Sequence, residues 1–129
     1  MKKTNTKTRT VLEILNEKDI KEIVTVEPAR SIFDALTIMA QYKIGALIVM
    51  KGSKMVGIIS ERDYAREIFI EGRSSRDTKV QEIMTKKVLT LSADDKFDKG
   101  LDIMTKKRIR HLPVMHGKEL VGMVSQGDL

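Results

Sequence analysis

Apolar and polar positions along the chain form two similar patterns, one in each half. Apolar runs of strand length cover residues 46–50 and 55–59, and a short segment containing Gly52 separates them. Two such runs joined through glycine predict a β-hairpin. The runs at 112–115 and 120–124, with Gly117 between them, predict a second hairpin. Because these runs are continuously apolar rather than alternating, we expect helices to cover the strands.

A segment with helical periodicity precedes each hairpin. The apolar positions of the first such segment are Ile32, Ala35, Leu36, Met39 and Ala40, and those of the second are Phe97, Gly100, Leu101 and Met104. Brief strands are predicted before these helices, at 24–26 and 89–91. A helix from Arg62 is predicted after the first hairpin, with an apolar face of Tyr64, Ala65, Ile68 and Phe69. The predicted fold class is α/β (α+β type), in the order β-α-β-β-α.

This order is repeated because the sequence itself is repeated. Residues 23–63 align without a gap with residues 88–128, and 13 of the 41 pairs are identical. The preceding segments 11–15 and 80–84 also match. The repeat predicts a basic N-terminal tail, two copies and a linker, at 1–10, 11–72, 80–129 and 73–79. The second copy stops at Leu129, where its closing helix is expected, so we expect that helix to be missing.

Each copy is small for an independent core, since domains of about 60 residues are marginal. We therefore expect the two copies to pack together about an approximate two-fold axis. Such an arrangement would make one module of the two motifs.

The composition excludes several kinds of functional site. The chain has no Cys and only two His, which excludes disulfides, thiolate metal sites, Cys nucleophiles and a three-His metal site. No apolar run approaches the roughly 20 residues of a membrane-spanning helix, and no signal-peptide pattern follows the basic start, so we expect a cytoplasmic protein. The net charge of +6 favours anionic partners, or is a solvated basic surface.

Ser60 with Asp63, and Ser125 with Asp128, stand where a hairpin strand leads into the following segment. A carboxylate there could accept hydrogen bonds from both hydroxyls of a ribose, while Ser and helix N-terminal N–H groups face a phosphate. Ser-x-x-Asp is also a capping box, and on spacing alone capping is the better interpretation. The same spacing recurs at two other predicted helix starts, Ser31-x-x-Asp34 and Ser92-x-x-Asp95.

Arg108, Arg110 and His111 cluster before the second hairpin, and guanidinium groups bind phosphate well. Each could equally be a surface or packed residue. The corresponding residues of the first copy are Lys43, Gly45 and Ala46. Conversely, the first copy has Arg62 where the second has Gly127. We therefore expect two non-equivalent sites.

The repeated order, together with the segments 57–63, 122–128 and 108–114, resembles the CBS motif, over nearly the whole chain from residue 11. The resemblance implies a paired module with two clefts that bind adenine-containing ligands: AMP, ADP, ATP, NAD(H) or S-adenosylmethionine. It also implies a homodimer that signals ligand occupancy to a target protein, here unknown.

The resemblance assigns roles to the candidate residues. It implies that Asp63 and Asp128 bind the ribose. It implies that the phosphate is bound by Ser60, Ser125, Arg62, Arg108, Arg110 and His111. It implies that the adenine is bound by Thr25, Thr90, Ile58 and Met123. Strand propensity explains the two Thr residues equally well. Arg73, Ser74, Ser75 and Arg76 could contact a longer ligand or be a solvated linker.

Three functions are compatible with the sequence. The preferred one is a sensor of adenine nucleotides. The alternative is a ligand-independent oligomerisation scaffold with vestigial clefts. Nucleic-acid binding is less favoured, because aromatic residues for base stacking are scarce and no nucleic-acid motif occurs. Catalysis is the least favoured, since the sequence has no Gly-rich phosphate loop, zinc spacing or paired metal-binding carboxylates. We therefore expect a non-enzymatic protein.

Overall fold

The computed structural model describes residues 9–18 and 23–129, which form two compact units. The central unit comprises Val24–Val88. The terminal unit combines the described residues up to Ile23 with Leu89–Leu129. The basic tail predicted at 1–10 lies outside the described residues except for Arg9 and Thr10. No helix of the described ranges is both long and apolar enough to cross a membrane.

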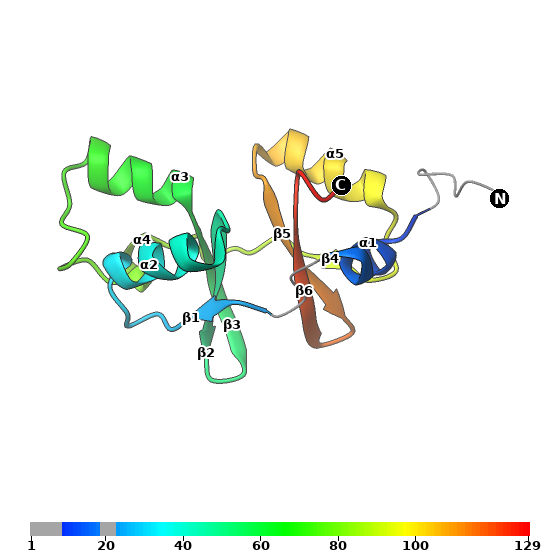
Figure 1. The fold of residues 1–129 in the computed structure, drawn as a ribbon, viewed down its shortest axis with the longest axis horizontal. Helices are drawn as coiled ribbons and strands as arrows, with labels where there is room; N and C mark the ends of the chain where they lie inside the picture. Colours follow the sequence, from blue (N-terminus) through cyan, green and yellow to red (C-terminus); the bar gives the residue numbers. More distant parts are fainter. Residues whose placement is uncertain (1–8, 19–22) are drawn as a thin grey trace. The chain divides into compact units, whose positions relative to one another are not determined.

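The central unit contains a three-stranded sheet in the order β1-β2-β3 (Figure 1). Strand β1 (Thr25–Val26) runs parallel to β2 (Ala46–Lys51), and helix α2 (Ile32–Tyr42) connects them. Strand β3 (Lys54–Ser60) pairs antiparallel with β2 as the predicted hairpin. Helix α3 (Glu61–Tyr64) and the π-helical segment η2 (Ala65–Ile70) follow.

The terminal unit repeats this sheet in the order β4-β5-β6. Its elements are β4 (Leu91–Ser92), α5 (Phe97–Lys107), β5 (His111–His116) and β6 (Glu119–Ser125). Irregular features repeat as well. The hairpin register shifts after Val49 and again after Val114. Lys43 and Arg108 end α2 and α5 in the same left-handed conformation, each with φ of 56°. The predicted mixed α+β class is confirmed.

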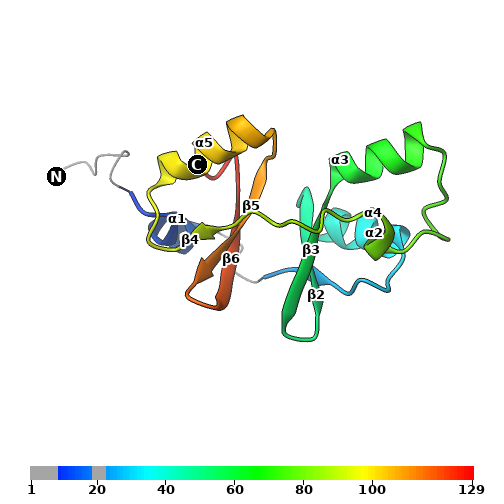
Figure 2. The ribbon, with the colours of Figure 1, turned by 180° about the vertical axis from the view of Figure 1, so that it is seen from behind.

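Short helices from the start of each sequence copy pack on the sheet of the other copy (Figure 2). Helix α1 (Val11–Glu17) begins the first copy but contributes to the core of the terminal unit. Helix α4 (Val80–Ile83) begins the second copy but contributes to the core of the central unit. The packing units and the sequence copies therefore do not coincide.

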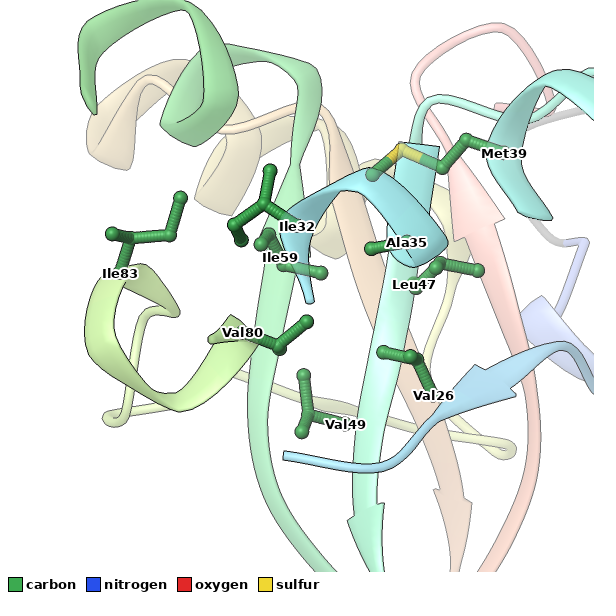
Figure 3. Close-up of a cluster of buried hydrophobic side chains, with 9 residues drawn as sticks. All are labelled: Val26, Ile32, Ala35, Met39, Leu47, Val49, Ile59, Val80 and Ile83. Carbon is green, nitrogen blue, oxygen red and sulfur yellow. The ribbon is translucent and has the colours of Figure 1, made fainter. Parts of the chain in front are cut away.

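The core of the central unit lies on one face of its sheet (Figure 3). Strand residues of that face meet side chains of α2 and α4, and all are nearly inaccessible. The nine residues are Val26, Ile32, Ala35, Met39, Leu47, Val49, Ile59, Val80 and Ile83. Burying one such large aliphatic side chain stabilises the fold by about 1.5–3 kcal/mol. On this face, helices cover the central hairpin as expected.

The opposite face carries several of the candidate residues. Thr25, Ile48 and Ile58 are direct neighbours across β1, β2 and β3, so their side chains share this second face. In the terminal unit Pro113 pairs with Met123, and His111 with Ser125. Since side chains alternate along a strand, these residues lie on the face away from Leu112, Val114 and Val124 of the core.

Strand β4 begins later than the sequence predicts. In the central unit β1 pairs from Thr25, opposite Ile48. The residue equivalent to Ile48 is Pro113, which has no N–H to donate. Pairing of β4 therefore starts at Leu91, opposite Val114. The predicted strand 89–91 is correct only at Leu91, and Thr90 lies outside the sheet.

The apolar face predicted after the first hairpin is partly wrong. Tyr64 and Ile68 pack against the core as expected, but Ala65 is exposed and Phe69 is 72% exposed. The reason is the π-helical winding of 65–70, whose wider turn rotates later side chains away from the face that 3.6-residue periodicity predicts. In the terminal unit, residues 126–129 form a hydrogen-bonded turn, and Leu129 packs against the core.

Candidate functional site at the strand ends

The carboxylate of Asp63 belongs to a capping box at the end of β3. Asp63 Oδ2 accepts from Ser60 N–H at 3.0 Å, and Ser60 Oγ in turn accepts from Asp63 N–H at 3.4 Å. Asp63 Oδ1 accepts from Arg66 NH2 at 3.0 Å. The residue is only 6% exposed. In this structure, both carboxylate oxygens are therefore engaged within the central unit.

Asp128 occupies the equivalent place at the end of β6 but has a different partner. Its Oδ2 accepts from Ser125 N–H at 2.7 Å and from Lys18 Nζ at 2.9 Å. Lys18 Nζ also donates to Met123 O at 2.9 Å. Burial of the Asp128 carboxyl raises its pKa, but the hydrogen bonds and charge of Lys18 and the Ser125 N–H outweigh this, so the net pKa lies below the usual value. Asp128 is therefore charged at neutral pH.

Not every Ser-x-x-Asp spacing forms a helix cap. Ser31 caps α2 as predicted, accepting from Asp34 N–H at 3.0 Å. Ser92 and Asp95 instead close the turn before α5, whose N-cap is Lys96. The prediction of a helix start at Ser92 is therefore wrong, because the helix begins after this turn.

Two of the predicted phosphate-binding residues lie beside the Ser125–Asp128 turn. His111 begins β5 directly opposite Ser125, and the carbonyl of Arg110 accepts from Gln126 N–H at 2.8 Å. Arg108 lies at the left-handed end of α5, two residues before Arg110. The structure thus brings this basic cluster to the same end of the terminal sheet as Ser125 and Asp128.

The central unit has the same main-chain arrangement with different side chains. The carbonyl of Gly45 accepts from Glu61 N–H at 3.0 Å, matching the Arg110–Gln126 bond. Gly45 and Ala46 occupy the positions that Arg110 and His111 have in the terminal unit, so the basic side chains are missing there. Arg62 is instead exposed in the first turn of α3. The two strand ends are therefore not equivalent in charge.

The residues assigned to adenine are brought together only in part. Thr25 and Ile58 share the second face of the central sheet, with Ile48 between them. Met123 shares a face with His111 and Ser125 in the terminal unit. Thr90 is exposed outside the strand.

The linker residues contact the central unit. Arg73 pairs with Glu82 at 2.6 Å, and Arg76 lies 4.0 Å from the centre of the Phe33 ring. Ser75 O accepts from Phe33 N–H at 2.9 Å. These contacts show that the linker is bound to its own unit and is not merely solvated.

A hollow of about 610 Å³ lies between the end of α2 and the start of α3. It is lined mainly by apolar side chains, with Lys43 and Glu61 among them. None of the residues assigned to ribose, phosphate or adenine lines it. It adjoins the central strand end only through Gly45 and Glu61.

Sequence reasoning missed two cations, Arg66 and Lys18. Arg66 follows Asp63 by three residues within one helical stretch, and that spacing alone favours an ion pair. Lys18 lies 110 positions before Asp128, and no local pattern connects them. Only the packing of α1 on the terminal sheet brings this lysine to the site.

Comparison with known proteins agrees with this architecture. The family model described as CBS domain matches residues 11–70 and 80–129. The mitochondrial CBS domain-containing protein CBSX3 of Arabidopsis thaliana is 44% identical over 104 residues, which cover 77% of this chain and 50% of that protein. This chain therefore spans half the length of that relative.

Solved structures show the same fold. A protein with CBS domains from Burkholderia ambifaria is 43% identical, with a TM-score of 0.90, over 93% of this chain and 90% of that one. The CBS domain pair of protein MJ0100, in complex with 5′-methylthioadenosine and S-adenosyl-L-methionine, is 28% identical, with a TM-score of 0.81, over 94% and 92%. Since the family model matches both copies and solved relatives share their fold, the chain belongs to the CBS domain family as a tandem pair of CBS domains.

Proposed function

We propose that this chain is a regulatory, non-catalytic module that binds an adenine-containing ligand at its strand-end sites. The candidate ligands are AMP, ADP, ATP, NAD(H) and S-adenosylmethionine. Occupancy would bias the conformation of a cytoplasmic homodimer and so change its contacts with a target protein. Membership in the CBS domain family and the complex of the MJ0100 relative with two adenosine compounds support this proposal.

The proposal rests on one observation: a carboxylate, a main-chain carbonyl and basic side chains lie together at the end of β6. A charged carboxylate (Asp128), a strand-edge carbonyl (Met123) and the basic residues Arg110 and His111 lie at or beside the Ser125–Asp128 turn. A carboxylate can accept from ribose hydroxyls, and Arg can donate to phosphate. These groups suit the binding of a nucleoside phosphate better than the binding of nucleic acid, because the chain has few aromatic residues on which bases could stack.

The test is a thermal-shift panel of AMP, ADP, ATP, NAD, NADH and S-adenosylmethionine, with the dissociation constants of active ligands measured by calorimetry. A ligand at 100 times its dissociation constant should stabilise the protein by about 2.7 kcal/mol. We expect Asp128→Asn to abolish the shift. The matched control is Asp95→Asn in the same unit, because Asp95 Oδ2 also accepts from a Ser N–H, that of Ser92 at 2.8 Å, and Asp95 Oδ1 pairs with Lys99.

The two variants separate ligand binding from a structural role of the carboxylate. A purely structural Asp128 would cost stability when replaced, as we expect for Asp95, and would leave the ligand shift intact. That result would contradict the assignment of ribose to Asp128.

A ligand-independent scaffold is the second candidate, and the central unit favours it. Asp63 already has both oxygens engaged, and Phe69 and Ile70 expose apolar surface, at 72% and 76%. This function predicts a stable oligomer whose melting temperature and mass no compound in the panel changes. Such a result would replace the sensor proposal.

A further inference from the structure

The two copies close the outer edge of their hairpins by different means. In the central unit Ile58 faces Ile48 in the hairpin, yet its N–H and C=O bond to the main chain of Thr85, at 3.0 and 2.9 Å. This follows from the antiparallel pattern, in which alternate residues turn their N–H and C=O away from the partner strand. Two main-chain hydrogen bonds therefore cover this edge.

In the terminal unit the equivalent edge residue is Met123, which faces Pro113. Its carbonyl accepts from the ammonium of Lys18 at 2.9 Å, and the same ammonium lies 2.9 Å from Asp128 Oδ2. A side chain thus stands where the central unit has main chain. It bridges the two acceptors that the proposed function assigns to adenine and ribose.

The main chain of Lys18 is anchored although its side chain can rotate. Lys18 is the C-cap of α1, and its N–H donates to Leu15 O at 3.2 Å. Helix α1 is in turn fixed by Val11 and Ile14 in the core. Lys18 can therefore leave Met123 by side-chain rotation, whereas Thr85 can leave Ile58 only by breaking main-chain pairing.

The ion pair shields the carboxylate. The side chains of Lys18 and Asp128 are 27% and 21% exposed, and the ammonium uses two of its three donors on Met123 and Asp128. A ribose hydroxyl that donates to Asp128 Oδ2, or a base amino group that donates to Met123 O, must take the place of this ammonium or share its acceptors.

We propose that Lys18 is a displaceable occupant of the terminal-unit site and sets its affinity for adenine nucleosides. This inference rests on the proposed function. The terminal-unit site opens when Lys18 rotates away, so it is the site that binds ligand, while the main-chain pairing at Ile58 keeps the central one closed. The ligand class is a nucleoside with a vicinal diol and an amino group, whose donors replace those of the ammonium.

The test compares Lys18→Met with wild type, using adenosine and AMP as probes in isothermal calorimetry. Methionine keeps the unbranched apolar stem and removes the three donors and the charge. We expect adenosine to bind Lys18→Met about three- to tenfold more tightly, as removal of a partly buried, hydrogen-bonded competitor allows. Because AMP also gains from a nearby cation, its affinity should rise less.

Arg66→Met is the matched control, because Arg66 is the cation that pairs with Asp63 in the central unit. It should change adenosine affinity less than twofold. Lys18→Gln retains donors without charge and should give an affinity between those of wild type and Lys18→Met. Circular dichroism of each variant checks that the fold is kept.

The outcomes distinguish this inference from the function on which it rests. Unchanged or weaker adenosine binding by Lys18→Met, with wild type still binding, overturns the role of Lys18 and leaves the sensor function standing. Weaker binding would assign Lys18 to holding the ligand. If neither protein binds adenosine or AMP, the sensor function fails for these ligands and the inference fails with it.

Discussion

Asp63 and Asp128 are equivalent in sequence, yet their carboxylates have different cationic partners. Asp63 pairs with Arg66 from its own helical segment, whereas Asp128 pairs with Lys18 from α1. The first ion pair joins residues three positions apart in one helical segment, and the second depends on the tertiary fold. Identical motifs therefore have different electrostatic environments.

The environment of Asp128 predicts a pH-dependent stability. Because its folded pKa lies below the usual value near 3.9, the charged form stabilises the fold above that pH, and this contribution is lost as pH falls through the folded pKa. We expect Asp128→Asn to lower the free energy of unfolding by about 0.5–1 kcal/mol at pH 7, as is usual for partly exposed pairs. At pH 2.5 the difference should be much smaller. Urea unfolding at both pH values measures this, and an equal deficit at both would show that charge plays no part.

Two glycines stand at equivalent places in β3 and β6, and close packing of a neighbouring helix explains each of them. A Cβ on Gly57 would lie 2.5 Å from Met84 Sδ and 3.0 Å from Thr85 O, which follow α4. A Cβ on Gly122 would lie 3.0 Å from the Leu15 side chain on α1. Each glycine thus lets the short helix of the other sequence copy approach the strand.

The two substitutions should have unequal effects. Gly57→Ala presses on main chain and should destabilise the fold by about 1–3 kcal/mol, the usual range for overpacking. Gly122→Ala meets only the end of a flexible side chain and should cost less. Urea denaturation of both variants tests the order, and a larger loss for Gly122→Ala would contradict it.

Local sequence was sufficient for the two hairpins and α2, but not for every element boundary or for the partners of each element. The hairpins and α2 follow from apolar runs and helical spacing, because each reflects short-range periodicity. The exposed Phe69 was not predictable from that spacing, since the π-helical winding changes the period within one element. The Ser-Asp pairs were recognised, but whether Lys18 or Arg66 contacts them depends on which helix packs on which sheet.

Because α1 and α4 each pack on the sheet of the other sequence copy, the structure predicts which fragments of the chain fold. Residues 24–88 contain the central sheet, α2 and α4, and so keep the complete core around Val80 and Ile83. Residues 11–72 form one sequence copy of similar length but lack α4. We expect cooperative thermal unfolding for the fragment 24–88 and a broad or absent transition for 11–72. Calorimetry of both fragments measures this, and equal cooperativity would mean that α4 is dispensable.

The same packing has a consequence for synthesis on the ribosome. The central unit can complete its core once residue 88 has emerged, whereas α1 must wait for β5 and β6, about 100 residues after it was made. At about 5–20 residues per second, the apolar side chains of α1 wait for about 5–20 s. Of the two units, the terminal one, with Lys18 and Asp128, is therefore the later to form, and a nascent chain acquires its proposed ligand site only when translation has reached Asp128.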